Sequence, residues 1–245
     1  MFIGSEIEIL QDGSLAFGED IFYPDPDVYY LEDSLDVMYQ KPEQLDKHPL
    51  YCTYMGVYKK QDSLLFQEMH LRHDLTMVFP GLTANEFYKT PGHFLSLKPD
   101  SHETYVAIYE VLWGEGLFLL QKNNRSGEAE EARVISAKKG DKVFIPPSYG
   151  LVLINIGQDK LVTSGLVNVK ADFIYEPFIQ KQGAAYYYIV NENQKPDFIK
   201  NPRYAQTVGL ELLGAPSVSL PFDELKEKNL YQTFVDNPKL FNAFK

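Results

Sequence analysis

The stretch YVAIYEVLWGEGLFLLQ, residues 105–121, consists of two apolar runs that meet at a tight turn, Trp113-Gly114-Glu115-Gly116. A second stretch, KGDKVFIPP at residues 139–147, contains a turn, a short apolar run and a double proline. Proline has no amide hydrogen to donate to a β-ladder, so a strand here must end where the two prolines begin. Both stretches predict short strands separated by sharp turns.

The same pattern extends outward, from Pro49 to Val190, as short runs of Val, Ile, Tyr, Phe and Thr between clusters of Gly, Pro, Asn and Asp. Runs so closely spaced indicate a closed or double-sheet antiparallel barrel, so we predict an all-β fold. The strands are expected near residues 50–58, 64–70, 73–79, 93–98, 104–113, 116–121, 131–136, 142–146, 151–156, 161–168 and 184–191.

The two flanking segments differ from this barrel pattern. The N-terminal one mixes short alternating runs with one plausible short helix around residues 34–39. The C-terminal one contains residues 221–228 and 238–244, both of which begin with proline, a residue that the first helical turn accepts. We therefore expect a single domain with decorations, divided into an N-terminal arm at 1–48, the barrel at 49–203 and a C-terminal helical extension at 204–245.

The composition restricts the partners of the chain. It has 23 Lys and Arg against 34 Asp and Glu, and the formal net charge of −11 repels phosphate backbones and anionic lipid surfaces. We expect no nucleic-acid partner and no membrane partner. A single cysteine, Cys52, excludes an internal disulfide and cysteine-cluster metal sites. The first residues lack the basic segment and apolar core of a signal peptide, so the cytoplasm is the expected location.

Three segments together resemble the cupin motifs of the archaeal-type glucose-6-phosphate isomerases. They are the stretch from Lys89-Thr90-Pro91-Gly92 to His93, the stretch from Tyr105 to Gly116 and the stretch from Gly140 to Gly157. The resemblance covers roughly residues 50 to 203. It implies a cupin fold, which is a jelly-roll or double-stranded β-helix barrel, together with a homodimer and a sugar phosphate as the small-molecule partner.

Members of that family hold a divalent metal, such as Fe, Mn, Ni or Zn, with three histidines and one glutamate. The resemblance places the four ligand positions at His93, Leu95, Ala107 and Leu151, so one ligand of four is retained. A catalytic metal of this kind normally needs about three protein ligands. We therefore expect no metal cofactor. The alternative is a site rebuilt from His70, His93 and a carboxylate.

The phosphate-binding side of the family site is better preserved. The resemblance implies that the phosphate is held by hydroxyls, a lysine and a glycine backbone, which form a local cradle of donors. It also leaves His93 and Tyr109 as candidate catalytic residues. The positions that match the family's phosphate-binding side are Thr76, Lys89, Thr90, Gly92 and Tyr109.

Isomerisation between an aldose and a ketose needs a base that moves a proton or a metal that polarises oxygens, and the missing ligands remove much of that machinery. The leading hypothesis is a cupin that binds a sugar phosphate or a similar small ligand, with isomerase activity weak or lost. An active isomerase with a metal-free or rebuilt site is the first alternative. A scaffold whose C-terminal helices bind a partner is the second.

Overall fold

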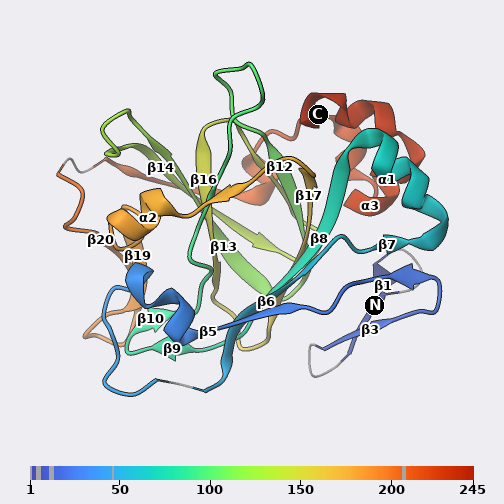
Figure 1. Cartoon of the computed structure of the whole chain (residues 1–245). Helices are drawn as coiled ribbons and strands as arrows, with labels where there is room; N and C mark the ends of the chain where they lie inside the picture. Colours follow the sequence, from blue (N-terminus) through green and yellow to red (C-terminus); the bar gives the residue numbers. More distant parts are fainter. Residues whose placement is uncertain (1, 4–6, 11–13, 46, 206–207) are drawn as a thin grey trace.

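The computed structural model of the chain describes residues 2–3, 7–10, 14–45, 47–205 and 208–245. Two sheets form its barrel (Figure 1). The first has the strand order β15 (Lys142–Ile145), β12 (Ala107–Trp113), β17 (Leu161–Asn168), β8 (Leu71–Val78), β6 (Pro49–Met55) and β5 (Asp27–Tyr30). The second has the order β16 (Tyr149–Asn155), β13 (Glu115–Asn123), β14 (Ala129–Lys138) and β21 (Leu210–Gly214).

Neighbouring strands of these two sheets are antiparallel except for β14 and β21, which run parallel. The predicted all-β jelly-roll barrel is confirmed. Smaller sheets surround it. They comprise β1 (Phe2–Ile3), β2 (Ile7–Ile9) and β3 (Leu15–Phe17); β4 (Ile21–Phe22) with β7 (Tyr58–Lys59); β20 (Pro196–Lys200), β19 (Tyr186–Val190), β10 (Glu86–Phe87) and β9 (Leu82–Thr83); and β11 (Phe94–Leu95) with β18 (Phe173–Ile174).

Strand β12 shows why the barrel strands read as nearly continuous apolar runs. Its alternate side chains Ala107, Tyr109 and Val111 face the core between the two sheets. Ile108 points the other way, into a second core beneath the C-terminal segment. Because successive side chains of a strand point to opposite faces, a strand covered on both faces needs apolar residues at almost every position.

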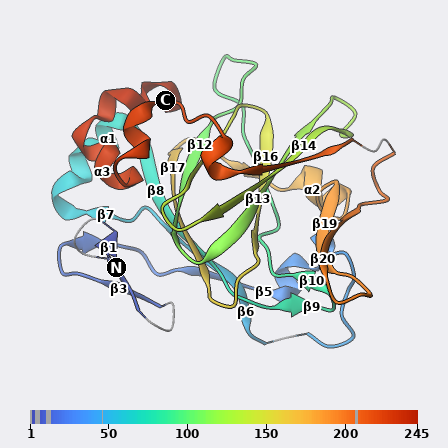
Figure 2. The same ribbon diagram turned by 180° about the vertical axis from the view of Figure 1, so that it is seen from behind.

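The second core is built largely by the C-terminal segment, which lies beside α1 (Ser63–Met69) on the outer face of the first sheet (Figure 2). Its helices are two 3-10 helices, Asp223–Lys226 and Pro238–Phe244, and α3 (Leu230–Asp236). The N-terminus of α3 is tied to the sheet, because the Leu230 amide donates to Glu110 Oε2 at 2.5 Å. Lys142 Nζ lies 3.5 Å from the Glu110 carboxylate and compensates its buried charge.

Several sequence predictions of local structure were wrong. The strand expected at 64–70 is instead helix α1, which ends at Met69, because Phe66 and Met69, three positions apart, are the buried side chains of that run. The strand expected at 93–98 is shorter than predicted and comprises only β11. The helix expected at 34–39 is a 3-10 helix at Leu31–Val37. The two helices expected in the C-terminal segment are present as 3-10 helices. Helix α3, which lies between them in the sequence, was not predicted.

The barrel sheets also extend past the predicted barrel limits at residues 49 and 203. Strand β5 pairs with β6 from within the arm, and β21 pairs with β14 from within the extension. Within the described ranges, the remaining helical elements are the 3-10 helices Lys60–Asp62 and Ala215–Ser217 and the short helix α2 (Glu176–Gln180). Among the described residues, no helix has both the length and the apolar character needed to cross a membrane.

Candidate functional site

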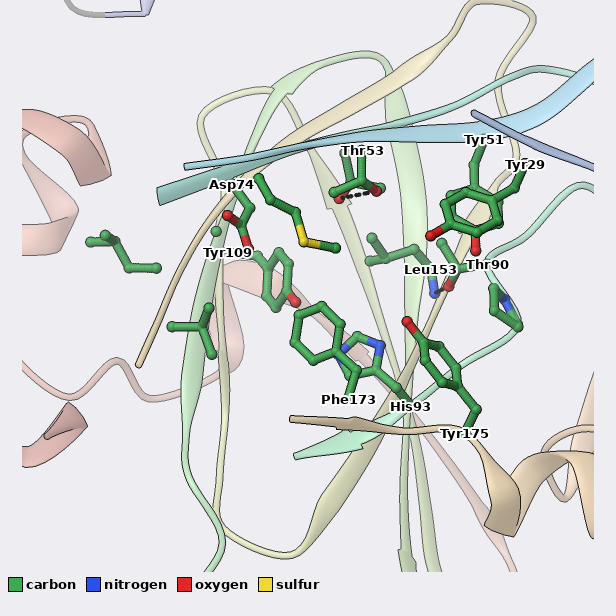
Figure 3. Close-up of a pocket in the computed structure, with 16 residues that line it drawn as sticks. Tyr29, Tyr51, Thr53, Asp74, Thr90, His93, Tyr109, Leu153, Phe173 and Tyr175 are labelled. Carbon is green, nitrogen blue, oxygen red and sulfur yellow. Dashed lines mark hydrogen bonds between the residues drawn. The ribbon is translucent and has the colours of Figure 1, made fainter. Parts of the chain in front are cut away.

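A cavity of about 50 Å³ lies inside the barrel, between the two sheets, and is closed on one side by the chain around residues 90–93 and 173–175 (Figure 3). Its walls come from β5, β6, β8, β12, β16 and β17. The polar side chains in its lining are Tyr29, Tyr51, Thr53, Asp74, Thr76, Thr90, His93, Tyr109 and Tyr175.

Hydroxyls are the commonest polar groups in this lining, which is otherwise largely apolar. The Thr53 and Thr76 hydroxyls, on adjacent strands β6 and β8, are 3.4 Å apart (Figure 3). The Thr90 hydroxyl accepts a hydrogen bond from the Leu153 amide at 3.0 Å, which fixes its orientation. Burial raises the pKa of the Tyr175 hydroxyl to about 12, and burial also raises the pKa of Tyr109. Both phenols are therefore neutral hydrogen-bond donors at physiological pH.

His93 lies at the edge of the cavity, with its ring against Phe173 at a centroid distance of 4.2 Å and near Tyr175 at 6.1 Å. Its backbone is fixed by a bridge to Leu151, since each amide of the pair donates to the other residue's carbonyl. Burial lowers the pKa of the imidazole to about 4, so His93 is neutral near pH 7. The contacts with Phe173 and Tyr175 fix the position of the imidazole ring, which forms part of the cavity wall.

One ion pair lies beside the cavity, where the Arg72 guanidinium carbon is 5.7 Å from the centroid of the Phe173 ring. Arg72 Nε donates to both carboxylate oxygens of Asp74, at 2.8 and 3.0 Å, and the Gly56 amide donates to Asp74 Oδ1 at 2.9 Å. Burial raises the pKa of the Asp74 carboxyl, while the adjacent guanidinium acts to lower it. Arg72 and Asp74 are not among the site residues predicted from the sequence. The alternation of Arg72, Asp74 and Thr76 on one strand face was the signal that could have revealed it.

The positions that the resemblance matches to the family's metal ligands are, apart from His93, filled with hydrocarbon. Leu95, Ala107 and Leu151 are 5%, 2% and 2% exposed and belong to the same buried core. Methyl groups offer a metal no donor atoms, so these residues do not fit the family's cofactor. Among the described residues, no three His, Cys, Asp or Glu side chains gather in a way that could hold a metal ion. His70 is exposed, in a left-handed conformation at the end of α1, and is not part of the cavity lining.

The structure brings together four of the six predicted site residues. Thr76, Thr90, His93 and Tyr109 all line the cavity, whereas Lys89 and Gly92 are not part of its lining.

The Lys89 ammonium is buried elsewhere, where it donates to Glu86 Oε1 at 2.5 Å and to the Val37 carbonyl at 2.8 Å. It also lies 5.0 Å from the centroid of the Tyr187 ring. We therefore leave Lys89 out of the candidate site.

Gly92 has a positive φ of +83° and is packed tightly against the chain behind it. A Cβ atom at this position would lie 2.6 Å from Val152 Cγ2 and 2.9 Å from Phe178 Cδ2. Glycine is thus required here for packing and backbone conformation, whatever ligand the site takes.

The family model and the curated relatives that match this chain agree on one family. Residues 26–205 match the profile of the family described as glucose-6-phosphate isomerase (GPI). The glucose-6-phosphate isomerase of Pyrococcus furiosus is 30% identical over 138 residues, which are 56% of this chain and 67% of the relative. That of Pyrococcus horikoshii is 26% identical over 161 residues, which are 62% of this chain and 79% of the relative.

Solved structures with a similar arrangement share little sequence with this chain. Recombinant oxalate oxidase in complex with glycolate has a TM-score of 0.40 and 14% identity, over 58% of this chain and 64% of the other. The vicilin of Capsicum annuum has a TM-score of 0.35 and 17% identity, over 50% of this chain and 30% of the other.

Proposed function

Because the chain belongs to the glucose-6-phosphate isomerase family, we propose that its barrel cavity binds a small sugar-type ligand without a metal and that isomerase activity is weak or lost. Sugar phosphates are the first candidates from the family membership. One observation carries the proposal. The cavity keeps a lining of hydroxyls from Thr76, Thr90 and Tyr109, while the metal-ligand positions beside it have become buried hydrocarbon.

The chemistry of the remaining groups supports binding more than catalysis. Isomerisation requires a base that takes a proton from one carbon and returns it to its neighbour. An imidazole with a pKa of about 4, such as that of His93, is a weak base at neutral pH. The Asp74 carboxylate is engaged by Arg72 and by the Gly56 amide, which fixes it as a structural anion. Neutral threonine and tyrosine hydroxyls are instead well suited to hold the hydroxyls of a sugar.

Binding is tested by calorimetry with glucose 6-phosphate, fructose 6-phosphate and 5-phosphoarabinonate. A neutral hydrogen bond contributes about 0.5 to 1.5 kcal/mol, so Tyr109→Phe should weaken binding by about two- to ten-fold. The control is Tyr23→Phe, since Tyr23 is 47% exposed and is not part of the cavity lining. Equal effects of the two substitutions would place the ligand elsewhere. Absence of binding by every sugar and sugar phosphate tested would overturn the proposal.

The second test concerns metal and catalysis. Elemental analysis of the purified protein is expected to find no stoichiometric Fe, Mn, Ni or Zn, because Leu95, Ala107 and Leu151 supply no donor atoms. Isomerisation of glucose 6-phosphate is expected to stay near background with and without added divalent metal. A metal-stimulated rate in the range of ordinary enzymes, about 1 to 10³ per second, would instead support an active isomerase.

A further inference from the structure

A groove of about 330 Å³ adjoins the cavity on the side of the 3-10 helix Leu31–Val37. Four residues line both spaces, so the groove continues the cavity toward the surface. They are Tyr29, Tyr51, Pro91 and Tyr175. The rings of Tyr29 and Tyr51 are stacked at a centroid distance of 4.5 Å, and Figure 3 shows them on the same side of the cavity as Tyr175. A ligand larger than the 50 Å³ cavity would extend past these rings into the groove.

Ser34, in the wall of the groove, has an unsatisfied hydroxyl. The residue is 3% exposed, and its Oγ atom has no hydrogen-bond partner. A buried polar group without a partner is costly, on the order of 1 to 3 kcal/mol, so such groups are uncommon. A ligand in the groove that exchanges a hydrogen bond with Ser34 would remove this cost.

The charges around the two spaces are unusual for a site that takes a phosphate. The groove lining contains the carboxylates of Asp33, Asp36 and Glu176, and the cavity lining contains Asp74. Within the described part of the chain, neither lining includes a lysine or an arginine.

Two of these carboxylates already have a cation. Asp74 is bound to Arg72, and Asp36 lies 3.3 Å from Lys41 Nζ. Asp33 accepts a hydrogen bond from the Tyr30 amide at 2.7 Å, and neither Asp33 nor Glu176 forms a salt bridge with another described residue. Both residues are exposed and line the groove beside the tyrosine rings, so two negative charges border the space that a ligand would occupy. Carboxylates repel a phosphate, whereas carboxylates and aromatic faces attract an ammonium group and accept hydrogen bonds from sugar hydroxyls.

We propose that the cavity and the groove form one site that selects an unphosphorylated sugar carrying an amino group over a sugar phosphate. This inference rests on the proposed function, because it names the class of sugar that the same cavity takes. The sugar hydroxyls meet Thr76, Thr90 and Tyr109 inside the barrel. The ammonium group lies in the groove near Glu176 and Asp33, and a hydroxyl of the ligand meets Ser34.

The test compares glucosamine, glucose and glucose 6-phosphate by calorimetry at about pH 6, where the amine is protonated. We expect glucosamine to bind at least five-fold more tightly than glucose 6-phosphate at low salt. The difference should shrink at about 0.5 M salt, because partly exposed charges are screened.

Two variants locate the preference. Glu176→Gln should weaken glucosamine by about two- to five-fold and strengthen glucose 6-phosphate, since removing one nearby charge is worth up to about 1 kcal/mol. Ser34→Ala should weaken every sugar that binds in the groove by a similar factor. The control is Glu192→Gln, which removes the same charge from an exposed residue between β19 and β20 and should change neither affinity.

The outcomes separate this inference from the proposed function. Glucose 6-phosphate binding as tightly as glucosamine, with Tyr109→Phe weakening both, would overturn the charge preference and leave the cavity as a sugar site. A glucosamine preference that Glu176→Gln and Glu192→Gln reduce equally would reflect only the net charge of the protein and would also overturn it. No binding by any of the three sugars would overturn both proposals.

Discussion

His73, on β8, is a fully buried histidine that takes no part in the cavity. Its Nδ1 lies 2.9 Å from the Val57 carbonyl oxygen, and since a carbonyl only accepts, Nδ1 carries the proton. The other ring nitrogen has no hydrogen-bond partner, and the ring packs edge-on to Tyr231 at 5.1 Å. Burial lowers the pKa of His73 from 6.5 to about 4, so the folded state holds the neutral form.

This pKa predicts how stability depends on pH. Between about pH 6.5 and pH 4 the unfolded chain binds a proton at residue 73 that the folded chain excludes, so the free energy of unfolding falls as the pH falls. The full loss is on the order of 3 kcal/mol, and the contribution is fully present above pH 6.5. Urea denaturation at about pH 7 and pH 4.5 should show that the free energy of unfolding falls less between these pH values for His73→Asn than for the parent. Equal losses would contradict the assignment to His73.

Gly92 and Gly140 provide a matched pair for separating backbone strain from packing. Both have a positive φ, +83° and +89°, but a Cβ atom at Gly140 would have no heavy atom within 4 Å. Gly140→Ala should therefore cost about 1 kcal/mol of stability, from the left-handed backbone alone. Gly92→Ala adds a clash with Val152 and Phe178 and should cost about 2 to 4 kcal/mol. If chemical denaturation gives similar losses of stability for both variants, Val152 and Phe178 can move away from the added methyl group with little loss of energy.

At the residue scale, the sequence indicated part of the hydroxyl lining, did not indicate Tyr29, Tyr51 or Thr53, and misplaced Lys89. Thr76 and Thr90 could be found because the motif resemblance places them on segments that meet in the barrel. The partners of Lys89 could not be found in the same way. The Val37 carbonyl, at the end of the 3-10 helix Leu31–Val37, lies 52 positions away, and no local pattern predicts that it will receive an ammonium group.

At the scale of elements, the errors have a common physical origin. Helix α1 was taken for a strand because its apolar residues are dense, yet Gln67 and Glu68 interrupt the alternation and Phe66 and Met69 follow a helical spacing. Strand β21 was missed because it is a short edge strand that has Leu212 65% exposed. Its partner β14 lies more than seventy positions earlier in the chain, so its pairing depends on tertiary contacts.

The C-terminal segment is an integral part of a core, which bears on the scaffold hypothesis. Leu230, Phe234 and Phe241 are each 0% exposed and pack on the first sheet. Deleting residues 206–245 would therefore expose this apolar face instead of simply removing a partner-binding appendage. Point substitutions give a cleaner measure of the role of the segment.

Leu230 and Leu212 form a matched pair for that measurement, since they are 0% and 65% exposed. Leu230→Ala should lower the free energy of unfolding by about 2 to 5 kcal/mol, because it leaves a cavity between α3 and the sheet. Leu212→Ala should change it by less than about 0.5 kcal/mol. Denaturant titration of both variants checks this. A negligible effect of Leu230→Ala would show that the segment is only loosely attached and would favour the scaffold hypothesis.

At the scale of the whole molecule, the homodimer expected from the family stays a prediction, and two features of the chain support it. Strand β5 is the edge of the six-stranded sheet, and an edge strand presents unpaired backbone groups to a second chain. Apolar side chains are exposed on or near this edge, among them Phe22, Tyr23, Val28 and Tyr30.

The net charge of the chain adds a salt dependence to the predicted dimer. Each copy carries a net charge of −11, so two copies repel one another at low ionic strength and the repulsion is screened as salt is added. Light scattering at micromolar concentrations should therefore show a dimer that becomes more stable between about 20 mM and 500 mM salt. Val28→Asp, which places a further negative charge on β5, should shift the equilibrium toward the monomer. Leu212→Asp, on the edge strand of the other sheet, adds the same charge and should leave the dimer intact. A monomer under all of these conditions, or equal dissociation by both substitutions, would remove β5 as the dimer contact.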